Sequence, residues 1–141
     1  MRKYTTIFTL IVSLLICAAV FADEEGETIK FYDSYVKTSM KTNSLDELKP
    51  YLSQNNLNQL GEISKEDEAA FLDIMREVRS SIKRTSISSK IEGNKAILTM
   101  EGVDTNDPNA KVSGIITLVK ENGQWKLDNE DFTSETVIES P

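Results

Sequence analysis

The spacing of apolar residues along the chain changes once, near Arg84. Between Glu27 and Lys83, apolar side chains recur every three or four positions, which is the period of a helix with one buried face. After Arg84 they alternate with polar residues, which is the period of a strand with one buried face. The pattern predicts an α+β domain in which N-terminal helices pack on a curved antiparallel sheet of about four strands.

Two helical segments are expected before residue 62. The first has one buried apolar stripe with two aromatic residues beside it: Ile29, Tyr32, Val36 and Met40, flanked by Phe31 and Tyr35. A short second helix begins at Ser44, because Ser44 and Glu47 have the spacing of a capping box, in which both side chains accept hydrogen bonds from free backbone N–H groups. Pro50 limits that helix, and one more helical turn follows, with Ser53 as its cap and Gly61 as its terminator.

The third helix has the clearest end signals. Ser64 is expected to cap it, acidic residues crowd its first turn, and basic residues collect toward its end, as the helix dipole favours. Its buried face is expected to consist of Phe71, Ile74, Met75, Val78 and Ile82. The charge asymmetry could mark a docking surface, but matching to the helix dipole explains it without a partner.

The strands after Arg84 end in a well-defined hairpin. Asn122 and Gly123 suit a type I′ turn, because both central residues of that turn need a positive φ. A two-residue turn at this place sets Leu118 opposite Leu127 and Lys120 opposite Trp125. The face that packs on the helices is then Ile87, Ile91, Ala96, Leu98, Met100, Val112, Ile116, Leu118, Trp125 and Leu127. Its middle contains no ionisable side chain, so a cavity between sheet and helices is expected to be apolar.

The opposite face of the sheet is not uniformly polar. Charged and hydroxyl side chains surround a partly apolar middle, which consists of Ile97, Thr99, Ile115, Thr117 and Val119. A solvated sheet face usually alternates cleanly, so this outer patch is expected to be covered by the C-terminal tail FTSETVIES (132–140), by a second copy of the protein or by a different partner.

Residues 1–22 have the layout of a secretory signal peptide, with a basic start, an apolar run from Ile7 to Val20 and small residues before an acidic stretch. Cleavage after Ala22 would leave 23–141 as a single α+β domain with a short C-terminal tail, exported to the periplasm or secreted. The apolar run is shorter than the about 20 residues that a membrane span needs, and no span is expected. Alternatively, Cys17 could be the lipid-modified cysteine of a bacterial lipoprotein. We favour cleavage after Ala22, because Ile16 stands where a lipoprotein has a small residue.

Removing residues 1–22 takes away two of the 16 basic residues and none of the 23 acidic ones, which leaves a net charge of −9. This balance argues against nucleic acid and against anionic membranes as partners. With Cys17 discarded there is no thiolate ligand, and the chain has no His. The segment 104–109, DTNDPN, lacks the Gly and Glu of a calcium loop and is expected to be a turn loop. No metal and no cofactor are expected.

The order of the elements and the closing segment LVKENGQWKLDNEDF resemble the nuclear transport factor 2-like, or cystatin-like, α+β superfamily. The chain is especially similar to small exported bacterial members that end in a hydrophobic-x-x-Glu-x-Gly-x-Trp-x-hydrophobic hairpin, and the similarity covers roughly residues 27–132. The resemblance implies a cone, in which a bent sheet wraps around the first helix with a pocket at its open end. Enzymatic members place a His, Asp or Tyr in that pocket. The superfamily includes isomerases, hydrolases and dimerisation modules, so the resemblance implies a fold but no particular function.

Four aromatic residues are candidates for lining a ligand pocket: Tyr32, Tyr35, Tyr51 and Trp125. For Tyr32 and Tyr35, a core position with a satisfied hydroxyl is the favoured interpretation. Tyr51 could rim the pocket or hold the short helix in place, and Trp125 could stack on a ligand or anchor the hairpin. Three carboxylates near the end of the sheet are expected to be solvated rather than catalytic: Asp128, Glu130 and Asp131. No catalytic residue is assigned.

Three functions remain, in order of preference. The first is a non-catalytic exported domain that binds a small apolar ligand or a protein partner through its pocket or its outer sheet face. The second is a structural envelope module that associates with itself, for example as a homodimer. The third is an enzyme of the isomerase or hydrolase type with a tyrosine or a carboxylate in the pocket.

Overall fold

A computed structural model describes residues 23–136 of the chain. The proposed signal peptide, with Cys17, and residues 137–141 lie outside the described residues. An N-terminal helix covers residues 23–39. After it come η1 (Leu45–Glu47), η2 (Lys49–Tyr51), α2 (Gln54–Leu60), α3 (Glu68–Ser80), β1 (Ile82–Glu92), β2 (Lys95–Asp104), β3 (Ala110–Glu121) and β4 (Gln124–Thr136). The α+β fold with N-terminal helices and a four-stranded antiparallel sheet is confirmed.

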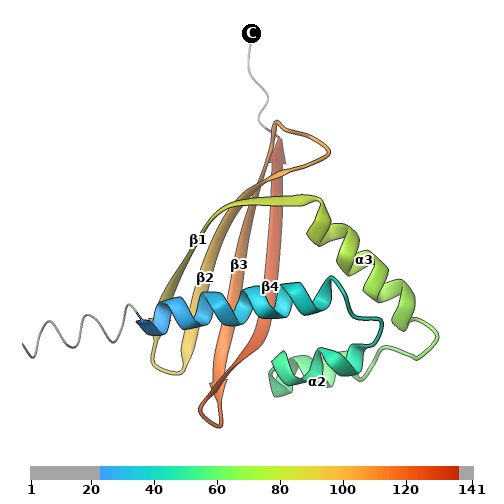
Figure 1. Ribbon diagram of the computed structural model, residues 1–141, viewed down its shortest axis with the longest axis vertical. Helices are drawn as coiled ribbons and strands as arrows, with labels where there is room; N and C mark the ends of the chain where they lie inside the picture. Colours follow the sequence, from blue (N-terminus) through green and yellow to red (C-terminus); the bar gives the residue numbers. More distant parts are fainter. Residues whose placement is uncertain (1–22, 137–141) are drawn as a thin grey trace, which may run out of the picture.

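The strands are ordered β1-β2-β3-β4, and each pairs with its neighbours in sequence. The N-terminal helix lies across the sheet, whereas α2 and α3 lie toward the edge formed by β4 (Figure 1). Polar contacts join the N-terminal helix to the sheet: the Oγ1 of Thr28 and the Oγ of Ser89 are 2.7 Å apart, and Glu24 pairs with Lys120 at 2.7 Å. The sheet and this helix therefore form one packed unit, and α2 and α3 complete one side of it.

The hairpin between β3 and β4 has the predicted turn and register. Asn122 has φ 51° and Gly123 has φ 77°, as a type I′ turn requires. Leu118 pairs with Leu127, and Lys120 pairs with Trp125. The predicted inner face is also confirmed, because its residues on β2, β3 and β4 are buried: Ala96, Leu98, Met100, Val112, Ile116, Leu118, Trp125 and Leu127.

A β-bulge changes the direction of the side chains in the second half of β4. Leu118 pairs with Leu127, but Thr117 pairs with Asn129, so Asp128 has no opposite residue. Because side chains alternate along a strand, the extra residue reverses the alternation beyond it. Glu130 therefore points toward the helices, and the prediction that this carboxylate is solvated is wrong.

The strand also continues further than expected. Phe132 lies within β4 and packs against the buried core, although the sequence placed it in a tail that could cover the outer face. Residues up to Thr136 belong to the strand. Within residues 23–136, the tail therefore extends the sheet instead of folding over it.

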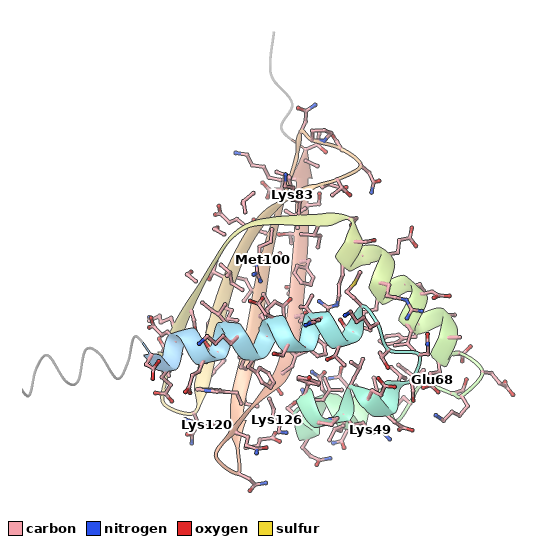
Figure 2. The ribbon with its side chains drawn as sticks, viewed as in Figure 1. Lys49, Glu68, Lys83, Met100, Lys120 and Lys126 are labelled. Carbon is pink, nitrogen blue, oxygen red and sulfur yellow. The ribbon has the colours of Figure 1, made fainter. Side chains whose placement is uncertain are left out.

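The short helices begin where predicted, but only part of the capping box forms. The Oγ of Ser44 accepts a hydrogen bond from the N–H of Asp46, and that of Ser53 accepts one from the N–H of Asn56. Glu47 does not complete the box. The N–H of Ser44 donates to the Oγ1 of Thr42 instead, and the next N–H, that of Leu45, donates to the Oε1 of Glu68 at the beginning of α3, at 2.7 Å. Figure 2 labels Glu68. Its contact with Leu45 ties α3 to η1.

Two predictions about α3 are wrong. The helix begins at Glu68, because Ser64 caps a preceding turn through the N–H of Asp67, and it ends at Ser80 before Ile82 enters β1. Its expected buried face is also largely exposed: Phe71 is 38%, Ile74 62% and Val78 44% exposed. The residue of α3 that is buried in the core is Leu72, which was not predicted to be buried.

Candidate binding groove

A cavity of about 510 Å³ lies between α2, α3 and β4, and we call it the α3 groove. Its apolar walls come mainly from Leu60, Ile63, Phe71, Ile74, Val78 and Phe132. Amide side chains, those of Asn56, Gln59 and Asn129, also line it. The exposed apolar side chains of α3 therefore face a hollow in the protein surface, where an apolar group could cover them.

The sequence forms this groove because two apolar faces of α3 compete for the core. Leu72 and Met75 pack against the core, and Arg79 lies further along the same helix. The stripe Phe71, Ile74 and Val78 has helical spacing too, but it lies beside the packed face. Because one helix cannot bury both faces against a single sheet, the second face is left at the surface.

A buried polar cluster lies at the side of the groove formed by β4. Glu130 accepts two hydrogen bonds, one from the hydroxyl of Tyr32 at 2.8 Å and one from the guanidinium of Arg79 at 2.7 Å. The side chains of Arg79 and Glu130 are only 7% and 16% exposed. The guanidinium carbon of Arg79 also lies 5.0 Å from the centre of the Tyr35 ring, in cation–π contact.

The pKa values of this cluster favour hydrogen bonding over proton transfer. Burial, followed by the Glu130 carboxylate, raises the pKa of Tyr35 to about 12, and the same causes raise the pKa of Tyr32 above its ordinary value. Burial alone would lower the pKa of Arg79, but Glu130 and the two tyrosines raise it overall. Both hydroxyls therefore stay protonated near neutral pH, and Glu130 already accepts hydrogen bonds from Tyr32 and Arg79.

The free energy of unfolding is expected to fall as the pH rises from 10 toward about 12. The unfolded chain loses the tyrosine protons at the ordinary pKa, whereas the folded chain keeps them, so the unfolded state binds fewer protons in this range. Each of the two tyrosines adds a slope of about 1.4 kcal/mol per pH unit. Urea unfolding followed by circular dichroism measures this slope, and Tyr35→Phe should remove one tyrosine's share of it. An equal slope in wild type and Tyr35→Phe would contradict the raised pKa.

The structure does not place the four predicted pocket residues in one cavity, although the rings of Tyr32 and Tyr35 lie 6.3 Å apart. Tyr35 lines the α3 groove, whereas Tyr32 lines a separate cavity of about 210 Å³. Tyr51 packs against the rings of Phe31 and Tyr35, at 5.8 and 5.9 Å between centres. Trp125 is buried beneath Lys120, whose Nζ lies 4.9 Å from the ring. Tyr51 and Trp125 thus hold the N-terminal helix and the hairpin in place.

The sequence did contain a signal for the groove. Phe71, Ile74 and Val78 form one apolar stripe at helical spacing, which the periodicity predicts to lie in the core. The sequence does not show the pairing of Arg79 with Glu130, because the bulge that turns Glu130 inward has no local signature. The outer patch is formed as expected by neighbouring β2 and β3, with Thr99 opposite Ile115 and Ile97 opposite Thr117.

Comparisons with protein-family models, with curated proteins and with solved structures give no match for this chain. Within residues 23–136, no group of three or more His, Cys, Asp and Glu side chains could hold a metal ion. The loop 104–109 forms two ordinary turns, in which Asp104 and Asp107 accept from the N–H groups of Asn106 and Asn109. No helix of the described part is long and apolar enough to cross a membrane.

Proposed function

We propose that the protein is a non-catalytic binding module whose α3 groove takes a small apolar ligand or an apolar segment of a partner. The observation that carries the proposal is the exposure of Phe71, Ile74 and Val78 around one cavity. Ligand pockets commonly measure about 300–1,000 Å³ and are lined mainly by apolar side chains, and this groove has both properties. Covering apolar surface contributes about 25 cal/mol per Å², so an occupied groove would be more stable than an empty one.

Two further parts of the proposal have their own support. The absence of catalysis is supported by the polar cluster, where Glu130 already accepts from Tyr32 and Arg79 and both tyrosines hold their protons. Export to the periplasm or beyond is supported by the signal-peptide pattern of residues 1–22. Membership of the nuclear transport factor 2-like superfamily is compatible with helices on an antiparallel sheet and with a cavity beside the first helix.

The groove is tested by titration with the apolar dye 8-anilinonaphthalene-1-sulfonate. The wild-type protein is expected to bind the dye with a blue-shifted emission, and Ile74→Asp is expected to weaken binding by about tenfold or more, because it places a charge in the apolar wall. Ala69→Asp is the matched control, since Ala69 is exposed on α3 and does not line the groove. Equal dye binding by wild type and Ile74→Asp, with both folded by circular dichroism, would remove the groove as the binding site.

Self-association through the outer patch is a second candidate. Ile115 is 45% exposed in the middle of this patch, and its neighbours Ile97, Thr117 and Val119 are half-buried. If the patch joins two copies, native mass spectrometry should show a dimer that Ile115→Asp converts to a monomer, because a buried unpaired carboxylate opposes association. Thr133→Asp, on the same face but outside the patch, should leave the dimer intact. A wild-type monomer at all concentrations tested would exclude this candidate.

A further inference from the structure

The edge of the sheet beside the α3 groove is only partly paired. β4 is the last strand and pairs with β3 on one side alone. On its other side, Leu52 forms a single parallel bridge with Leu127, where the N–H of Ser53 donates to the carbonyl oxygen of Leu127 at 2.9 Å. The hydroxyl of Ser53 also donates to Asp128. The chain then turns away into α2, and between residues 23 and 136 no group outside the sheet bonds to the backbone of 129–136.

This open edge and the exposed face of α3 border the same cavity. Asn129, Glu130 and Phe132 of β4 line the groove together with Ile74 and Val78 of α3. An edge strand presents unpaired N–H and C=O groups, and α3 presents apolar side chains. A small apolar ligand or a helix would satisfy only the apolar wall. An extended peptide satisfies both, because its main chain can pair with β4 while every second side chain faces α3.

We propose that the occupant is an extended apolar segment of a partner protein, which adds as a fifth strand along residues 129–136 of β4. This inference rests on the proposed function of the α3 groove and specifies its ligand. The bridge between Leu52 and Leu127 supports it, because one residue of the chain already occupies this edge as a strand would. The partner segment continues the strand pairing along β4 beyond Leu127, where the chain leaves this edge to form α2.

The charges on β4 indicate which residues the partner segment should carry. Asp131 and Glu135 are exposed and point away from the groove, on the outer face of the strand. Cross-strand neighbours of opposite charge are favourable, so the partner segment should carry Lys or Arg at the positions between its apolar residues. A second copy of this chain fits less well, because two antiparallel β4 strands centred on Thr133 would set Asp131 opposite Glu135.

The test is a selection from a random peptide library, with peptides as long as the open edge, against the exported wild-type protein and against Ile74→Asp. Enriched peptides should alternate apolar with basic or hydroxyl residues and should not bind Ile74→Asp. A synthetic peptide of the enriched sequence should slow hydrogen exchange by about tenfold or more at those 129–136 amides that do not bond to β3. Methylating its backbone nitrogens on the β4 side should weaken binding by about tenfold or more, since each change removes a main-chain hydrogen bond.

Three outcomes would overturn the inference. The first is enrichment of peptides with helical spacing, or peptide binding that backbone methylation does not weaken. The second is that no peptides are enriched on the wild type relative to Ile74→Asp, although the dye binds the wild type and does not bind Ile74→Asp. The groove function then stands, and the peptide inference fails. The third is a dimer that Ile74→Asp abolishes and that protects the 129–136 amides, which would make a second copy the occupant. If neither dye nor peptide distinguishes wild type from Ile74→Asp, the groove function fails as well.

Discussion

Replacing Glu130 by Leu is expected to lower the free energy of unfolding by about 3–5 kcal/mol, the usual effect of removing one partner of a buried ion pair. The change leaves the Arg79 guanidinium without its carboxylate in a site where its side chain is 7% exposed. Among the described residues, the buried Nε of Arg79 has no hydrogen-bond partner, so losing Glu130 leaves a second guanidinium nitrogen, Nη2, without its acceptor. The hydroxyl of Tyr32 loses its acceptor at the same time.

Urea unfolding of four variants separates the charge from the packing. Glu130→Gln keeps the shape of the side chain and should be destabilised less than Glu130→Leu. In Arg79→Met/Glu130→Leu no charge is left unpaired, and most of the stability should return. Asp131→Asn, at the adjacent exposed position, should stay within about 0.5 kcal/mol of wild type. A Glu130→Leu protein as stable as Asp131→Asn would show that Arg79 does not depend on this carboxylate.

The parts of the fold that local rules determine could be read from the sequence. The Asn122–Gly123 pair predicts a turn with two positive φ values, and a two-residue turn leaves one register for the flanking strands. The inner face of β2 and β3 then follows from strict alternation. These predictions depend on neighbouring residues only, so a single sequence is sufficient for them.

The bulge at Asp128 could not be predicted in this way. It is held by contacts between distant parts of the chain: the hydroxyl of Ser53 donates to Asp128, and the side chain of Asn56 donates to the carbonyl oxygen of Leu127. Nothing in residues 124–136 alone shows where the alternation reverses. Because Glu130 lies beyond the reversal, its partnership with Arg79 was also hidden, and with it the polar side of the candidate site.

The face of α3 was mispredicted for a related reason. Helical periodicity shows that Phe71, Ile74 and Val78 share one side, but it does not show whether that side meets the core or a cavity. The position of α3 is set by tertiary contacts, such as that between Glu68 and the N–H of Leu45. The sequence therefore contained the residues of the groove while indicating the wrong surroundings for them.

The corrected orientation of α3 predicts that two nearby aliphatic residues contribute very differently to the free energy of unfolding. Leu72→Ala should lower the free energy of unfolding by about 2–5 kcal/mol, because Leu72 is 1% exposed and the truncation leaves a cavity in the core. Ile74→Ala should change it by no more than about 0.5 kcal/mol, because Ile74 is 62% exposed and Ala is the better helix former. Urea unfolding of both variants measures the difference.

Dye binding provides the complementary measurement on the same two proteins. The folded fraction of Leu72→Ala should bind the dye as the wild type does, because Leu72 does not line the α3 groove. Ile74→Ala should bind more weakly, because it removes apolar surface from the groove wall. A residue that contributes to stability and a residue that contributes to binding would then lie two positions apart on one helix. The reverse result, with Ile74→Ala destabilised and Leu72→Ala unaffected, would restore the orientation expected from periodicity and would remove the apolar wall on which the proposed function depends.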